Sequence, residues 1–220
     1  MIWQALKLSL LVVSLATLII SVSGTAFGFL LAKKQFRGKD MLDAIFTLPM
    51  VLPPTVTGYY LILLLGRRGL LGEPLYSLTG WTVSFTWVAA VLASTVVALP
   101  LMVKSARAAI ESVDSDYEIA SYIMGKSELE TFFRITLPLA SRGIVAGVIL
   151  SFARAFGEFG ATLMLAGNIP GKTQTMPLAI YEAVVSGEDE RAKWLALILT
   201  GISVAVVYLT NRLSRPKGKR

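Results

Sequence analysis

Long stretches without a charged side chain alternate with short charged segments along the whole sequence. A helix needs about 20 apolar residues to cross about 30 Å of hydrocarbon, and four of the uncharged stretches approach or exceed that length. A fifth apolar stretch carries three charges, Arg142, Arg154 and Glu158. The pattern therefore predicts an all-α, polytopic membrane protein with five transmembrane helices, over residues 8–32, 44–66, 83–103, 139–165 and 194–212.

The remaining segments complete this prediction. The first apolar stretch is longer than the roughly 7–15 residues of a signal-peptide core and ends without a small-residue cleavage pattern, so we interpret it as a span. Residues 173–186 are too short and too polar for a sixth span, and we interpret them as a surface or re-entrant piece. The sequence thus predicts a single transmembrane domain over 5–213, followed by a basic cytoplasmic tail over 214–220.

The basic residues are distributed unevenly over the segments that join the spans. With the N-terminus outside, the inner segments hold fourteen Lys and Arg residues, the outer segments hold six, and Arg154 lies within a span. Lys and Arg are concentrated in the cytoplasmic loops of membrane proteins. We therefore expect the N-terminus outside, the C-terminus inside and the segment 104–142 in the cytoplasm.

The composition agrees with a bilayer environment and excludes several kinds of site. Of the 220 residues, 55% are hydrophobic and only 16% are charged. The chain has no Cys and no His, which excludes thiolate and imidazole zinc sites, disulfides, Cys nucleophiles and His-based triads. The net charge is +7, but the basic residues flank apolar stretches, so we expect them to meet the lipid bilayer and expect no nucleic-acid partner.

Two tripeptides look like the end of a phosphate-binding loop, GKS over 125–127 and GKT over 171–173. The earlier Gly that such a loop requires is replaced by Ala120 and Ala166, and no strand precedes either tripeptide. We therefore expect ATP to be hydrolysed elsewhere and do not expect this chain to be an enzyme.

The most informative polar stretch is the segment 114–138. Two S-x-x-E capping boxes, Ser115–Glu118 and Ser127–Glu130, each predict the start of a short helix. Gly125 lies between them, where a left-handed residue would end the first helix. The segment is therefore expected to form two short helices at an angle on the cytoplasmic side.

One stripe of the first short helix is apolar, formed by Ile119, Ala120, Ile123 and Met124. An amphipathic helix of this kind either lies on the lipid surface or fits the groove of a partner protein. The periodicity favours neither interpretation.

Prolines interrupt the predicted span 44–66. They free backbone carbonyls, which are tolerated only where protein or a water-filled cavity covers them. The interruption is either a simple kink or the lining of a translocation pathway. The candidate pathway residues are Pro53, Pro54, Thr55 and Thr57.

Arg154 and Glu158 are one helical turn apart within a predicted span, so they share a face and can pair. Charges at this depth are costly and usually face the bundle interior or a watery cavity. The pair is either a structural ion pair or part of an anion route, with Arg154 supplying positive potential and Glu158 holding it in position.

The segment 114–138 resembles the EAA loop of the membrane subunits of binding-protein-dependent ABC importers, whose pattern is E-A-A, three residues, Gly, nine residues and I-x-L-P. Ile119 stands at the Glu position with Glu118 before it, and Ser121 replaces the second Ala. The resemblance implies that this loop docks into an ATPase subunit. The residues it assigns to coupling are Glu118, Ile119, Ala120, Ser121, Ile123, Met124, Gly125, Ile135, Leu137 and Pro138.

The stretches 36–40, 48–72 and 152–171 are similar to the molybdate permease subfamily of these type-1 importers, close to the sulfate and tungstate permeases. This resemblance implies a multi-pass permease in a prokaryotic inner membrane. It also implies a second copy of the chain, two ABC ATPase subunits that bind ATP and Mg, and an extracytoplasmic oxyanion-binding protein. No cofactor is expected in this chain.

Two alternatives remain at this point. Tungstate and sulfate resemble molybdate in shape and charge, so a tungstate or sulfate permease fits the same resemblance. An ion-coupled secondary transporter would not need an ATPase, but such proteins more often carry paired, discontinuous spans in two halves. Copurification with an ATPase distinguishes the two classes.

Overall fold

The computed structural model describes residues 2–214, with the side chains of residues 2–208, and this part of the chain consists of helices and connecting loops without a strand. The predicted all-α class is confirmed. In chain order the elements are α1 (Ile2–Lys33), α2 (Lys39–Val51), α3 (Pro54–Leu65), α4 (Gly72–Thr79), α5 (Trp87–Glu111), α6 (Ser115–Ile123), α7 (Glu128–Thr131), the π-helical turn η1 (Phe132–Thr136), α8 (Leu137–Phe156), α9 (Gly160–Ala166), α10 (Met176–Val185) and α11 (Asp189–Ser214).

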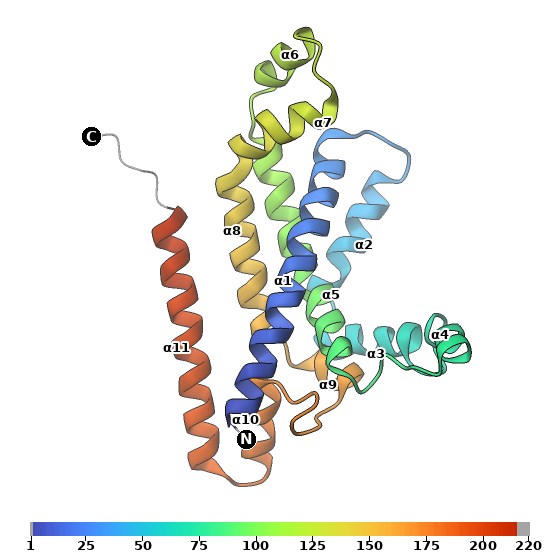
Figure 1. Ribbon diagram of the computed structural model, residues 1–220, viewed down its shortest axis with the longest axis vertical. Helices are drawn as coiled ribbons and strands as arrows, with labels where there is room; N and C mark the ends of the chain where they lie inside the picture. The colour runs from blue at the N-terminus through green and yellow to red at the C-terminus, as the bar shows by residue number, and fades with distance from the viewer. Residues whose placement is uncertain (1, 215–220) are drawn as a thin grey trace.

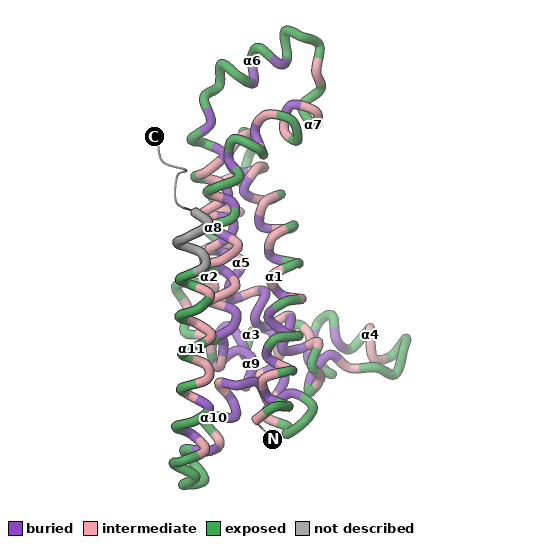
Figure 2. Tube along the Cα trace, turned by 60° about the vertical axis from the view of Figure 1, so that its left-hand side comes forward, coloured by how far each residue is buried: buried purple, intermediate pink, exposed green. Residues whose placement is uncertain are grey.

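Helix α5 packs against both α1 and α8, and buried residues are concentrated along it (Figure 2). Its buried face is rich in small side chains such as Ala98 and Ala106. Glycines on both neighbours face α5: a Cβ at Gly28 would lie 2.7 Å from the Cβ of Ala106, and one at Gly143 would lie 2.5 Å from the Cβ of Ala109. Small residues let helices approach closely inside a bilayer. These three helices form the packed centre that positions the other elements.

Replacing Gly28 by Leu is expected to destabilise the fold by about 1–3 kcal/mol, because a larger side chain would force α1 away from α5. Gly201 on α11 offers a matched control, since no atom in the described part of the chain lies within 4 Å of a Cβ placed there. Thermal unfolding of the full-length chain in detergent should show a lower midpoint for Gly28→Leu and an unchanged one for Gly201→Leu. Equal midpoints would contradict the close packing.

The predicted span 44–66 is not one straight helix. Helices α2 and α3 meet at 119° across a break at Leu52 and Pro53. Both residues are extended, with ψ of 145° and 137°. Pro54 then begins α3, where its missing N–H leaves no intrahelical hydrogen bond unmade. The prolines therefore redirect the chain sideways instead of merely kinking a span.

The predicted span 139–165 is also interrupted. Helix α8 ends at Phe156, and the short helix α9 follows only after a gap. Glu158 lies in this gap, and its Oε1 accepts a hydrogen bond of 2.7 Å from the N–H of Ala161 in the first turn of α9. At its other end α8 continues from α7 and η1, so the long apolar run is Glu128–Phe156. Four described helices are long and apolar enough to cross a membrane, or five with the bent α2–α3 pair counted as one span.

The segment 173–186 forms α10, which is too short to span a bilayer and lies against α1 and α11. Its N-terminal Met176 donates its backbone N–H to Ser9 Oγ on α1 at 2.7 Å. Ala179 and Ala183 are buried beside Leu195 of α11. The segment is therefore a packed helix at the N-terminal end of α1.

The loops of the chain collect at two opposite ends of the bundle (Figure 1). The α1–α2 loop, the α6–α7 hairpin and the last turn of α11 lie at one end, and the N-terminus, α9 and α10 lie at the other. These are the same two groups of segments that the basic residues separate. Which end faces the cytoplasm stays a prediction, and the predicted basic tail lies, beyond Ser214, outside the described residues.

The predicted orientation can be tested because the chain has no cysteine of its own. Ser186, after α10, and Ser115, at the start of α6, are both exposed. An impermeant thiol reagent added to intact cells should label Ser186→Cys, and it should label Ser115→Cys only after the membrane is permeabilised. The opposite labelling pattern would invert the topology.

Candidate coupling hairpin and translocation face

The hairpin over 114–138 begins with a different cap from the predicted one. Asp114 is the N-cap of α6, and its Oδ1 accepts a hydrogen bond of 3.0 Å from the N–H of Asp116. The predicted Ser115–Glu118 capping box is therefore wrong, since Ser115 is already the first residue of the helix. Because the carboxylate of Asp114 caps the helix, the side chain of Glu118 is free to turn toward the bundle.

Glu118 anchors the hairpin to two other elements. It is 8% exposed, its Oε2 pairs with Lys33 Nζ at 2.6 Å, and its Oε1 accepts a hydrogen bond of 2.6 Å from Thr136 Oγ1. Lys33 ends α1, and Thr136 ends η1 just before α8. A buried carboxylate with both oxygens satisfied is costly to displace, because a lost partner leaves an unpaired charge. These contacts tie α6 directly to the end of α1 and to the end of η1 that precedes α8.

The turn between the two short helices is stiff. Gly125 has a φ of +78°, which confirms the predicted left-handed residue. The predicted Ser127–Glu130 capping box is present. Behind the turn, the hydroxyls of Ser121 and Thr131 share a buried hydrogen bond of 2.8 Å. Both arms of the hairpin are thus held in one arrangement.

The outer face of the hairpin is apolar and open. Ile119 is 51% exposed, Ile123 82% and Met124 78%, and Ala120 is exposed beside them. Figure 1 shows the hairpin projecting past the ends of the long helices, away from their apolar middle. An exposed apolar patch in this position favours a protein partner over the lipid surface. Four more exposed apolar side chains extend it: Tyr117, Tyr122, Leu129 and Phe133.

The phenol of Tyr122 is neutral at physiological pH. Partial burial raises its pKa, and the nearby carboxylates of Glu118 and Glu128 raise it further. The exposed patch therefore presents a neutral hydroxyl donor among its apolar side chains.

The other residues of the resemblance do not reach this patch. As described above, Glu118 turns toward the ends of α1 and η1, and Ser121 lies behind the turn against Thr131. Ile135 lies in η1, Leu137 packs against the core as the first residue of α8, and Pro138 is in the first turn of that helix. They shape the base of the hairpin, and the exposed residues form its tip.

The two sets of predicted pathway residues lie next to each other. A Cβ at Gly160 of α9 would lie 3.0 Å from the Cβ of Pro54, and one at Gly58 of α3 would lie 2.8 Å from the Cα of Ala161. The start of α3 therefore packs directly on the start of α9, which Glu158 caps. Residues 53–57 and the Arg154–Glu158 pair belong to one region, although a hundred residues separate them in sequence.

Thr57 lines a cavity of about 170 Å³ between α2, α3 and α5, together with Pro49, Tyr60 and Val96 among others. Its Oγ1 is buried and has no hydrogen-bond partner within the described residues. A buried hydroxyl without a partner is uncommon and is available to water or to a solute. Pro53 and Thr55 are exposed at the mouth of the same bend, and Pro54 is half-buried.

Arg154 and Glu158 form the predicted ion pair, with Arg154 Nη1 2.8 Å from Glu158 Oε2. Their environments differ: the side chain of Arg154 is 34% exposed and that of Glu158 only 1%. The second oxygen of Glu158 caps α9 through Ala161. Glu158 therefore holds the start of α9, whereas the guanidinium of Arg154 is its counter-charge and stays partly exposed.

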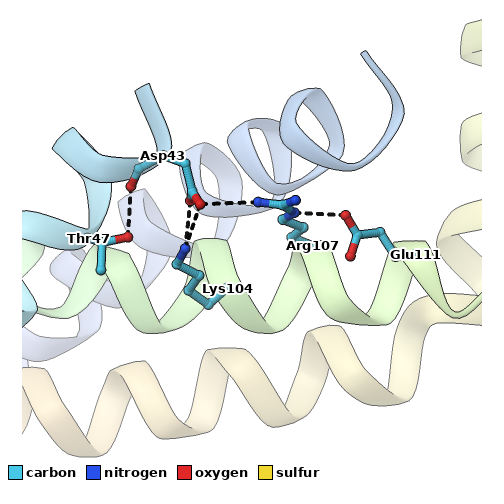
Figure 3. A network of polar contacts seen from close by, with 5 residues as sticks. All are labelled: Asp43, Thr47, Lys104, Arg107 and Glu111. Atoms are coloured by element: carbon cyan, nitrogen blue, oxygen red, sulfur yellow. Dashed lines mark hydrogen bonds and ion pairs between the residues drawn. The ribbon is translucent and has the colours of Figure 1, made fainter. Parts of the chain in front are cut away.

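A second charged cluster lies beside the ends of two predicted spans, 44–66 and 83–103, at residues for which the sequence predicted no role (Figure 3). Asp43 of α2 accepts from Lys104 Nζ of α5 at 2.7 and 2.8 Å, and from Arg107 Nη1 at 3.2 Å. Arg107 Nε also donates to Glu111 at 2.8 Å. Thr47 Oγ1 donates to the backbone carbonyl of Asp43. In the sequence, Asp43 and Lys104 were visible only as the charged ends of the uncharged stretches 44–66 and 74–103, so their pairing was missed.

Comparison with known proteins identifies a family and several relatives of this chain. The family model described as "Binding-protein-dependent transport system inner membrane component" matches residues 24–216. The chain is 44% identical over 222 residues to the molybdenum transport system permease protein ModB of Escherichia coli K12, covering 99% of this chain and 97% of that protein. It is 35% identical to the sulfate transport system permease protein CysW of Synechococcus elongatus, covering 99% of this chain and 76% of that one.

Among solved structures, the chain is similar to a bacterial alginate ABC transporter in complex with an alginate pentasaccharide-bound periplasmic protein. The TM-score is 0.77 at 17% identity, covering 96% of this chain and 77% of that one. This likeness shows a common fold.

Proposed function

Because the chain belongs to the family of binding-protein-dependent transport system inner membrane components, we propose that it is the membrane-spanning permease subunit of an ATP-driven importer for molybdate or a related tetrahedral oxyanion. The proposal joins three properties of the chain: a bundle of apolar helices, a rigid hairpin with an open apolar tip, and a bent face that carries an accessible Arg154.

The observation that carries the proposal is the 44% identity to a permease named for molybdenum transport, which extends over nearly the full length of both chains. Similarity of this extent includes the hairpin, the proline bend and the Arg154–Glu158 region.

The hairpin is the proposed docking surface for an ABC ATPase subunit. Its exposed tip, Ile119 to Met124, supplies an apolar knob for a groove on that partner. ATP and Mg would be bound by the ATPase, and this chain would hold no cofactor and perform no catalysis. Movement of the docked hairpin would reach the membrane helices through the contacts of Glu118 with Lys33 and Thr136.

A second copy of the chain is the proposed partner at the bent face. Helix α2 leaves Ile45, Leu48 and Val51 exposed next to the cavity, and α3 runs out sideways from the bundle (Figure 1). Two copies facing each other would cover these surfaces and enclose a route between them. Two ATPase subunits would then dock on the two hairpins, and an extracytoplasmic oxyanion-binding protein would deliver cargo at the opposite end.

Transport would proceed by alternating access. Closure of the two ATPases would bring the hairpins together, and rigid-body rotation of the attached helices would open the route to the other side. Arg154, accessible at the bend, would supply positive potential to the dianion. High affinity would belong to the binding protein, because a pathway must also release its cargo.

Sulfate is the second candidate cargo, favoured by the 35% identity to a sulfate permease over 99% of this chain. Molybdate, tungstate and sulfate are all tetrahedral dianions, so a competition experiment is needed to separate them. The family membership removes the alternative of an ion-coupled secondary transporter.

The proposal can be tested in vesicles that contain the full complex of this chain, its ATPase and its binding protein. Radiolabelled molybdate should enter when ATP is supplied. Excess unlabelled molybdate or tungstate should suppress this uptake at lower concentrations than sulfate. Stronger suppression by sulfate would instead favour a sulfate permease, and a complex that carries none of the three anions would refute the proposed cargo class.

A further inference from the structure

The charged cluster of Asp43, Lys104 and Arg107 has no part in the coupling hairpin or in the Arg154 region. All three side chains are partly accessible, with exposures of 23%, 42% and 28%. Arg107 is also paired with Glu111, whereas Asp43 is the only partner of Lys104 within the described residues. Withdrawal of Asp43 would therefore leave Lys104 without an ion-pair partner among the described residues and Arg107 paired with Glu111 alone.

Helix α2, which carries Asp43, is loosely attached. None of its residues, all of which the structure describes, is buried. Besides the ion pairs of Asp43, it packs along α5 and makes a ring contact of 4.4 Å between Phe46 and Phe27 of α1. Its far end is the extended Leu52–Pro53 break. Within this chain, a displacement of α2 about this break would therefore not empty any part of the core.

The cluster lies on the same seam between α2 and α5 as the cavity at the bend. Val96 of α5 lines that cavity. Arg107 is eleven residues further along α5 and, at 100° per residue, shares its face with Val96. Lys104 is eight residues from Val96, about 12 Å along the helix axis. Lys104 and Arg107 therefore lie further along α5 than the cavity, toward the end of the bundle that carries the hairpin.

The chemistry of the cluster suits an oxyanion. A carboxylate and a tetrahedral dianion both present pairs of negatively charged oxygens, and Lys and Arg side chains bind either group through charge-assisted hydrogen bonds. The three N–H···O contacts that converge on Asp43 are contacts that an oxyanion could receive in its place.

We propose that Lys104 and Arg107 form an oxyanion-binding site at the hairpin end of the translocation route, and that Asp43 is a tethered carboxylate that occupies this site whenever α2 lies against α5. The inference rests on the proposed function of the chain. Because Asp43 competes for the site, an anion binds there only in the fraction of molecules with α2 displaced, which weakens its apparent affinity. Return of Asp43 then displaces the anion, as release from a pathway requires.

The test is equilibrium binding of radiolabelled molybdate to the full-length chain in phosphatidylcholine nanodiscs. Asp43→Asn removes the competing charge and should tighten binding about 3–10-fold, the effect of raising the competent fraction from a minority to nearly all molecules. Asp189→Asn makes the same net-charge change at an exposed site at the start of α11 and should have no effect. The gain should vanish in the double variant Asp43→Asn/Lys104→Gln.

Unchanged or weaker binding in Asp43→Asn would overturn the inference, and so would an equal gain in Asp189→Asn, which would indicate net charge alone. The cations could instead hold a lipid phosphate. Nanodiscs containing phosphatidylglycerol test this source: retention of that lipid by Asp43→Asn, with unchanged molybdate binding in both lipids, would also overturn the inference. Molybdate uptake by the wild-type complex is measured in parallel. Absent uptake counts against the proposed function, whereas normal uptake with unchanged Asp43→Asn binding counts against this site alone.

Discussion

Ile123→Asp is expected to abolish ATP-driven transport and to release the ATPase subunit, while the permease itself folds normally. The side chain of Ile123 is 82% exposed, so the substitution removes no packing within the chain. In a docked groove the same carboxylate would be desolvated without a partner, at a cost of several kcal/mol. Truncation of a hot spot alone costs about 2 kcal/mol, or ~30-fold in affinity, and an unpaired charge should exceed that.

The measurement is copurification of the ATPase with tagged permease, together with the thermal midpoint of the permease alone. Ile123→Leu serves as the matched control, because it keeps the size and the apolar character of the side chain. It should retain the ATPase, and all three chains should unfold at the same temperature. If Ile123→Asp keeps both the ATPase and transport, the apolar tip lies on lipid and the docking role is wrong.

The double variant Arg154→Gln/Glu158→Gln is expected to assemble normally and to transport at least about tenfold more slowly, a loss of ~1.4 kcal/mol or more of transition-state stabilisation. The Gln at 158 can still accept the hydrogen bond from Ala161, so the start of α9 is kept. No buried charge is left unpaired. The cation that faces the route is absent, and the loss of its positive potential slows passage of a dianion.

The two single variants should differ, because the side chain of Glu158 is buried whereas that of Arg154 is partly exposed. Glu158→Gln leaves a partly exposed guanidinium that water can solvate, so yield and uptake should stay near normal. Arg154→Gln leaves the carboxylate of Glu158 buried with one backbone N–H, and yield should fall, since an unpaired charge of this kind costs about 3–5 kcal/mol when fully buried. Uptake is measured per assembled complex for each variant. Full recovery of uptake in the double variant would restrict Arg154 to a structural role.

Local patterns in the sequence predicted local features of the structure. The charge-free stretches identified an all-helical membrane protein, and the spacing of Gly125 and the Ser127–Glu130 box predicted the turn and second helix of the hairpin. The four-residue spacing of Arg154 and Glu158 predicted their ion pair. In each case the interacting groups lie within about one helical turn, where backbone geometry alone brings them together.

The features that were missed depend on contacts between distant segments. Lys33 and Glu118 are 85 residues apart, and Asp43 and Lys104 are 61 apart, so no local pattern pairs them. The capping rule failed at Ser115 because Asp114, one residue earlier, is an equally good cap that leaves Glu118 to the bundle.

Two predicted spans differ from the structure in shape and bounds for a related reason. Hydropathy measures how apolar a segment is. It contains no information on the direction in which the chain runs, so it could not reveal that the chain turns by 119° at Pro53. Nor could it reveal that α8 ends at Phe156 and that Glu158 then accepts a hydrogen bond from the first turn of α9.

The measurement that tests the account most directly is uptake of molybdate into vesicles containing the full complex, with ATP hydrolysis recorded in the same sample. ATP supplied on the side of the hairpin should drive uptake, ATP supplied only on the other side should not, and an imposed proton or sodium gradient should have no effect. Uptake that follows an ion gradient and continues without ATP would contradict the central claim that this chain is the permease of an ATP-driven oxyanion importer.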